Sequence, residues 1–166
     1  MDELDEAWTQ MLIAAGERAA VSGRSDVAEY LRLKATNDAI RGTGVKWLLD
    51  VFIDRAFGAN IPALQVDRSE GHSFRHGTST MAGTLLTVRL GVRCLSIEAG
   101  WARTPSHGIM RGAALARANI LHFGRKKHDQ GLKLVHSADL PEWVDDAAST
   151  FKIEDAERHI GHLLSD

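Results

Sequence analysis

Hydrophobic and polar residues alternate most regularly between positions 84 and 101, and this pattern predicts a β-hairpin. Gly91 and Val92 suit a two-residue type II′ turn, because glycine accepts the positive φ that the first central position of this turn requires. The turn places Leu90 opposite Arg93 and gathers most apolar side chains of both strands on one face. The predicted cross-strand pairs on this face are Val88 with Leu95, Leu86 with Ile97, Thr84 with Ala99 and Ala82 with Trp101. An isolated hairpin is only marginally stable, so we expect helices or further strands to cover this face.

Four other segments have apolar residues at helical spacing. Three precede the hairpin: the first covers residues 2–22, the second begins at position 25 or 26 and runs to a break at Gly42-Thr43-Gly44, and the third covers residues 45–57. A last helix is expected over residues 154–164.

The remaining segments predict further strands. Alternation over residues 63–68 predicts a short strand, and the apolar run at 132–135 predicts another. Segment 109–123 is compatible with both helix and strand, because its alanines favour a helix and its flanking glycines favour a strand. We favour the strand, since residues 132–135 need a partner and the nearest segment requires the shortest loop.

The order of these elements predicts an α+β fold, in which N-terminal helices pack on an antiparallel sheet of about five strands and a C-terminal helix follows. We expect a single globular domain over residues 1–166. It would comprise a helical half (1–58), a region that is mainly antiparallel sheet (62–136) and the C-terminal helix (150–165).

Composition is that of an ordinary folded chain, with 44% hydrophobic and 25% charged residues among 166. Cys94 is the only cysteine, so no internal disulfide can form. No stretch approaches the roughly 20 apolar residues of a membrane helix, and the first residues, MDELDEAW, are acidic where a signal peptide is basic. We therefore expect a cytoplasmic protein with no membrane partner.

Charge is distributed unevenly, although the net charge is only −2. Segment 103–133 is rich in bases, whereas the two ends of the chain are acidic. Either an anionic partner binds the basic segment, or the acidic ends pair with it. The candidate anion-binding residues are Arg111, Arg117, Arg125, Lys126 and Lys127. Nucleic acid is the less favoured partner, because the basic run at 125–127 has no aromatic residues between its cations for base stacking.

The polar stretch from Glu70 to Thr80 has the composition of a functional loop. Ser79, His76 and Glu98 supply the residue types of a hydrolase triad, although HGTSTM lacks the second glycine of a G-x-S-x-G elbow. A loop that satisfies its own backbone polar groups explains the same composition. The candidate ligand-binding residues are His72 and Arg75 in this stretch, and Trp101, Arg103 and His107 after the hairpin.

Metal and cofactor sites are not expected. His72 with His76, and His159 with His162, have spacings compatible with a shared helical face, but neither pair has a third ligand nearby in sequence. The second pair is interpreted as surface histidines. Glycine-rich phosphate loops are absent from the sequence.

Three functional hypotheses follow. The first is an intracellular, non-enzymatic binding module that engages a protein or an anionic ligand. The second is a small, hydrolase-like enzyme that uses the stretch from His72 to Ser79, and the third is a nucleic-acid binder that uses the basic segment. An open sheet edge would also allow a homo-oligomer.

Overall fold

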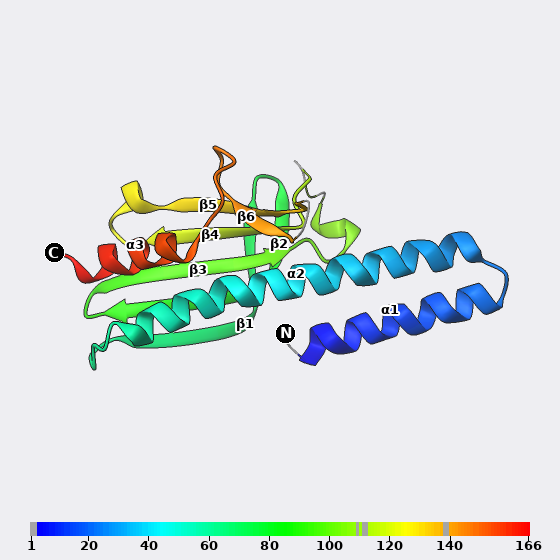
Figure 1. Cartoon of the computed structure of the whole chain (residues 1–166), viewed down its shortest axis with the longest axis horizontal. Coiled ribbons are helices and arrows are strands. Elements are labelled where there is room, and N and C mark those ends of the chain that lie inside the picture. Colours follow the sequence, from blue (N-terminus) through cyan, green and yellow to red (C-terminus); the bar gives the residue numbers. More distant parts are fainter. Residues whose placement is uncertain (1–2, 109, 111–112, 138–139) are drawn as a thin grey trace. The chain divides into compact units, whose positions relative to one another are not determined.

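The computed structural model describes residues 3–108, 110, 113–137 and 140–166. The chain divides into two compact units, Met1–Lys46 and Trp47–Asp166, and the expectation of a single domain stays a prediction. None of the helices in the described part of the chain has both the length and the apolar character needed to cross a bilayer. The elements in chain order (Figure 1) are α1 (Glu3–Val21), α2 (Ser25–Gly58), β1 (Gln65–His76), β2 (Ser79–Leu90), β3 (Arg93–Trp101), η1 (Pro105–His107), β4 (Ala116–His122), η2 (Lys126–His128), β5 (Gln130–Val135), β6 (Glu142–Val144) and α3 (Ile153–Leu164).

The first unit is a hairpin of two helices, α1 and the N-terminal part of α2. Small residues allow the helices to approach closely: a Cβ added to Gly16 would lie 3.5 Å from the carbonyl oxygen of Ala28. Asp38 is buried and accepts hydrogen bonds from Trp8 Nε1 at 3.2 Å and Arg41 Nη1 at 2.7 Å. The carboxylate of Asp38 thus joins α1 to α2.

The predicted helix break at residues 42–44 is wrong, because α2 continues from Ser25 to Gly58. A glycine costs a helix only about 1 kcal/mol relative to alanine. The apolar residues on both sides, Ala35 and Val45, are buried and favour the continuous helix.

The second unit contains a six-stranded antiparallel sheet in the order β1-β2-β3-β4-β5-β6. This confirms the α+β class, with one strand more than the approximate prediction. The extra strand is β6. Segment 109–123, which was compatible with helix or strand, contains strand β4, and β4 pairs with β5 as we favoured.

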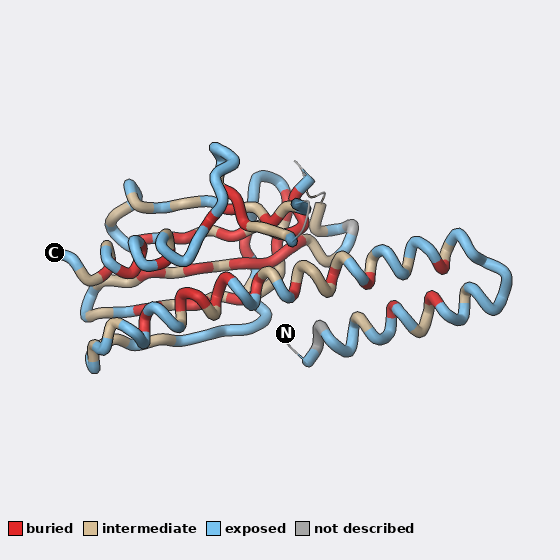
Figure 2. Tube along the Cα trace, viewed as in Figure 1, coloured by how far each residue is buried: buried red, intermediate tan, exposed pale blue. Residues whose placement is uncertain are grey.

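The predicted hairpin is confirmed in register and in its buried face. Gly91 has φ of 62°, and β2 pairs with β3 from Leu90 with Arg93 to Ala82 with Trp101. The side chains that face the core include Leu86, Val88, Leu95 and Ile97, all of which are fully buried. Figure 2 shows the buried positions along the central strands and on the sides of α3 and of the C-terminal part of α2 that face the sheet.

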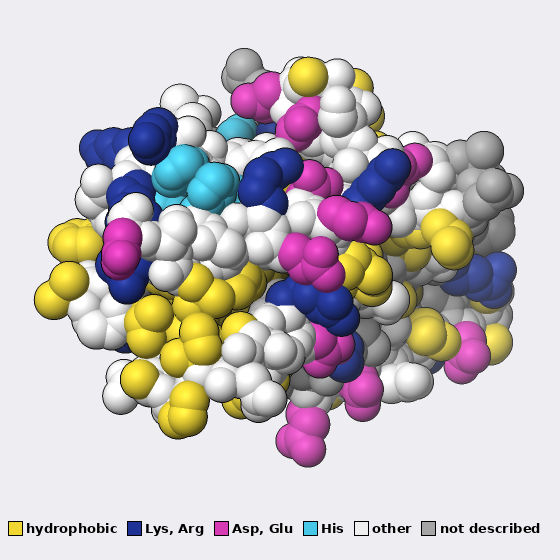
Figure 3. Space-filling view, turned by 60° about the vertical axis from the view of Figure 1, so that its left-hand side comes forward, with side chains coloured by type: hydrophobic (Ala, Val, Ile, Leu, Met, Phe, Trp, Pro, Cys, Tyr) yellow, Lys and Arg dark blue, Asp and Glu magenta, His cyan; other side chains and the backbone are white. Residues whose placement is uncertain are grey.

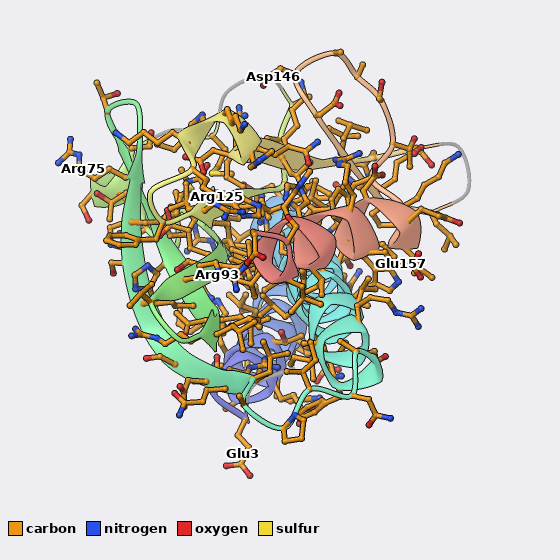
Figure 4. All side chains as sticks on the ribbon, turned by 90° about the vertical axis from the view of Figure 1, so that its left-hand side faces the viewer. Glu3, Arg75, Arg93, Arg125, Asp146 and Glu157 are labelled. Atoms are coloured by element: carbon orange, nitrogen blue, oxygen red, sulfur yellow. The ribbon has the colours of Figure 1, made fainter. Side chains whose placement is uncertain are left out.

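Two helical segments cover this apolar face. The C-terminal part of α2 and the whole of α3 lie on the same side of the sheet (Figures 1 and 4). Leu48, Leu49 and Phe52 of α2 are fully buried, and the ring of Phe52 lies 5.9 Å from that of Phe151, just before α3. Neither α3 nor the C-terminal part of α2 lies on the opposite face, which is called the uncovered face below.

The sheet bends sharply toward this uncovered face where Gly83 pairs with Gly100. A Cβ added to Gly83 would lie 2.6 Å from Cα of Gly100, and one added to Gly100 would lie 2.6 Å from the carbonyl carbon of Ala82. Both missing side chains would point to the side of Glu98, since residues two apart in a strand share a face. The end of the β1-β2 hairpin, residues 72–83, therefore folds over the uncovered face, as Figures 1 and 4 also show.

The predicted loop from Glu70 to Thr80 is wrong, because these residues form the end of β1, a tight turn and the start of β2. The short strand predicted at 63–68 is thus the first part of a 12-residue strand. A β-bulge between Glu70 and His72 shifts the register by one residue. Glu70 consequently faces the helices and hydrogen-bonds Thr84 at 2.7 Å, whereas His72 faces the other side.

The close approach at the bend leads to a prediction about stability. Gly100→Ala places a methyl group against the backbone of β2, so we expect it to lower the free energy of unfolding by about 3 kcal/mol, the upper range for overpacking. Gly131→Ala is the matched control in the same sheet, because its Cβ would lie 3.9 Å from Oδ1 of Asn119, an ordinary contact. Urea unfolding of both variants measures the difference. Equal losses of stability would contradict the close approach.

Candidate functional site

The uncovered sheet face carries mainly polar side chains, which are half-buried although α2 and α3 lie on the other face. On the three central strands these side chains are Thr87, Ser96, Glu98, Arg117 and Asn119. A polar face beside a folded hairpin is the best candidate for a functional site in the described part of the chain.

Glu98 is the centre of a hydrogen-bonded group on this face. Its Oε2 lies 2.8 Å from Nε2 of His72, and its Oε1 accepts a hydrogen bond of 3.0 Å from Nδ2 of Asn119. The side chains of His72 and Glu98 are 26% and 15% exposed, so the pair is partly accessible to solvent. Because the carboxylate accepts, Nε2 of His72 is the donor, and in the neutral form of the imidazole Nδ1 is then the acceptor.

Two local features place His72 beside Glu98. The bulge after Glu70 turns His72 to the uncovered face, and the bend at Gly83 brings the strand over the sheet. The ring of Phe74 stacks on that of His72 with centroids 6.0 Å apart, which restricts the orientation of the imidazole.

The predicted hydrolase residues are only partly brought together. His76 and Ser79 pair across the turn of the β1-β2 hairpin, but Glu98 binds His72 instead of His76. Ser79 is buried against Gly108, where an added Cβ would lie 2.7 Å from Ser79 Oγ. A shared reaction of Ser79, His76 and Glu98 therefore stays a prediction, because the carboxylate of Glu98 is engaged by His72.

His76 nevertheless lies near the same polar face. Partial burial, followed by the positive charge of Arg117, lowers the pKa of His76, whereas Asp146 opposes the shift. The tip of the hairpin therefore approaches β4 and the loop after β6. Arg75, another candidate, is exposed and projects from the tip away from the sheet (Figure 4).

Trp101, Arg103 and His107 form a separate compact group after β3. Trp101 belongs to the core, since only 3% of it is exposed. The guanidinium carbon of Arg103 lies 3.6 Å from the centroid of the Trp101 ring, and Nδ1 of His107 accepts a hydrogen bond from the Arg103 backbone. Arg103 thus covers the indole by a cation-π contact, and its Nε also donates to the carbonyl of Ala82.

The predicted anion-binding residues lie at two different places. Arg117 is on the uncovered face, near the start of β4, whereas residues 125–127 follow the far end of that strand. Nη1 of Arg125 donates to the carbonyl oxygens of His162 and Ser165 and so caps the C-terminus of α3. Arg111 lies outside the described residues. The structure therefore separates Arg117 from the basic run.

Four histidines from three elements meet between β4, η2 and α3, and the sequence did not predict this cluster. Nε2 of His122 and Nδ1 of His159 are 2.8 Å apart, and Nε2 of His159 lies 2.8 Å from Oε1 of Gln130. Arg158 also donates to this Oε1, which identifies it as the acceptor and His159 Nε2 as a donor. His122 Nε2 then donates to His159 Nδ1, so both neutral rings carry their proton on Nε2.

The interpretation of His159 as a surface residue is wrong, because only 2% of it is exposed. The sequence did contain a signal: His159 shares the apolar helical face of Ala156, Ile160 and Leu163, and His122 alternates with buried Ala118 and Ile120. The other two histidines, His128 and His162, lie nearer the surface.

Burial keeps the inner pair neutral. Desolvation, followed by the positive charge that His128 and His162 would carry, lowers the pKa of His122 to about 4. Desolvation, followed by His122, lowers the pKa of His159 to about 3. No group of three metal-ligating side chains with suitable geometry occurs among the described residues.

These lowered values predict acid sensitivity. Unfolded histidine has a pKa near 6.5, so between about pH 6.5 and pH 3 the unfolded chain binds a proton that folded His159 does not. The stability that neutral His159 contributes is therefore fully present above pH 6.5. As the pH is lowered, the free energy of unfolding falls by up to about 1.4 kcal/mol per pH unit because of this group. His159→Gln should make the dependence shallower in urea unfolding between pH 7.5 and 4.5. The exposed His136, changed to Gln, is the control, and an unchanged slope in His159→Gln would contradict the assignment.

No family model matches the chain, and no match is found among curated proteins or solved structures.

Proposed function

We propose that the chain is a binding protein that holds a small organic anion on the uncovered sheet face, next to Glu98 and His72. The observation that carries this proposal is the hydrogen-bonded group of His72, Glu98 and Asn119 on the sheet face opposite α2 and α3. Such a group orients donors and acceptors before a ligand arrives, which lowers the entropy cost of binding.

The charges around this group favour an anion. Arg117 and Lys133 are paired neighbours on adjacent strands and point to the same face. Glu98 already accepts hydrogen bonds from His72 and Asn119. The positive charges of Arg117 and Lys133 on the same face attract an anion. A guanidinium binds a carboxylate or phosphate with two parallel hydrogen bonds, and this geometry suits Arg117 for the charged end of the ligand.

A second candidate function is acid-base catalysis by His72. The 2.8 Å contact with Glu98 favours it, because a carboxylate that holds one imidazole nitrogen presents the other as a base toward a substrate. Asn119 would hold the carboxylate, and Arg117 would hold an anionic substrate. This arrangement differs from the serine hydrolase hypothesis, since it uses no nucleophilic side chain.

Benzoate serves as a simple carboxylate to test the binding proposal. Titration followed by NMR of the imidazole Cε1–H groups should shift the signals of His72 and His76. Arg117→Gln should weaken binding by at least about tenfold, the effect of one lost charge-assisted hydrogen bond. Arg89→Gln is the control, because Arg89 lies exposed at the other end of the same face, opposite Cys94. Equal weakening in both variants, with thermal unfolding unchanged, would contradict a site at Arg117.

The tautomer of His72 tests the acid-base candidate. Long-range ¹H–¹⁵N spectra should show a proton on Nε2 in the natural chain. In Glu98→Gln, the amide can accept from Asn119 through its oxygen and donate to His72 through its nitrogen, so the proton should move to Nδ1. Ser96→Ala on the same strand is the control. A proton already on Nδ1 in the natural chain would rule out His72 Nδ1 as the base.

A further inference from the structure

We propose that His128, His162, Lys126 and Lys127 form a second site, which binds a phosphate- or sulfate-type oxyanion and becomes stronger as the pH falls. Arg117 lies near the start of β4, whereas this second site follows the end of that strand. The second site is therefore independent of the function proposed above.

The central feature of this site is a stack of two imidazoles. The rings of His128 and His162 have centroids 3.8 Å apart and are inclined by only 18°, so they lie face to face. Both are half-buried, and Figure 3 shows histidine side chains at the surface with lysine and arginine side chains beside them. Each protonated imidazole supplies two N–H donors, so two adjacent rings offer several donors to an ion with several oxygen acceptors.

The surrounding charges on the β4-β5 connection are mostly positive. Partial burial, followed by the charges of His162, Lys127 and Arg125, lowers the pKa of His128, and among the described residues Asp129 opposes this shift. One carboxylate oxygen of Asp129 already accepts the backbone N–H of His122 at 2.7 Å. The carboxylate of Asp129 is therefore partly engaged by the backbone of β4.

The other neighbouring elements add little negative charge. On α3, Asp155 is paired with Arg158 at 2.8 Å. On β3, Arg93 donates to the carbonyl of Ser165 and lies 3.9 Å from Asp166. Beneath the stack, His122 stays neutral because of its burial and lies edge-on to both rings.

Protonation of the stack therefore calls for an external anion. Two imidazolium rings at this separation repel each other, and the nearby lysines increase the repulsion. An oxyanion removes it by accepting charge-assisted hydrogen bonds from both rings and from the two ammonium groups. Arg125 is not needed, since its guanidinium caps α3.

Sulfate is the probe, because it stays a dianion between pH 7.5 and 5.5 and any pH dependence then comes from the protein. Sulfate is titrated against chloride at constant ionic strength, with the histidine Cε1–H signals as the readout. We expect the signals of His128 and His162 to shift, and the affinity to be at least about tenfold higher at pH 5.5 than at pH 7.5, because uptake of one full proton raises the affinity about tenfold per pH unit. His136 is the internal reference, and its signal should not move.

Variants separate this site from general charge effects. Lys126→Gln with Lys127→Gln changes only exposed side chains and should weaken sulfate binding by at least tenfold at pH 5.5. His128→Asn should remove the pH dependence, and His136→Asn should leave it intact. The proposal is overturned if sulfate shifts His136 as much as the stacked pair, or if the lysine variant binds sulfate unchanged. It is equally overturned if lowering the pH to 5.5 breaks the contact between His128 of η2 and His162 of α3 and added sulfate does not restore this contact.

Discussion

The close approach of β2 and β3 at Gly83 and Gly100 is the constraint on which the candidate site depends. Any side chain at either position would overlap the backbone of the neighbouring strand. Because both positions are glycine, the sheet can fold toward the face opposite the helices. The end of the β1-β2 hairpin then covers part of that face, and His72 reaches a carboxylate on β3.

The β-bulge at the end of β1 adds the second condition. In a regular strand, Glu70 and His72 would point to the same side. One extra residue places Glu70 against Thr84, on the side of the helices, and His72 against Glu98 on the other side. The bend and the bulge together therefore place the end of the β1-β2 hairpin beside the candidate site.

Five histidines of the second unit occupy three distinct environments. His72 is partly exposed and held by a carboxylate, which suits it to ligand binding. His122 and His159 are buried and neutral, and they connect β4 to α3 through their mutual hydrogen bond. His128 and His162 stack near the surface among lysines, which suits them to binding an anion. The surroundings, and not the residue type, decide what each imidazole can do.

The sequence by itself determined the central hairpin, its register and its buried face, because a glycine turn and strict alternation are local signals that agree. It also determined the α+β class and the position of α3. Only the tertiary structure decided that residues 70–80 form strands, since these polar residues gain their ladder partners through a bend and a bulge. Likewise, His72 meets Glu98 and His122 meets His159 across 26 and 37 residues of chain, and separations of this length leave no local pattern to detect.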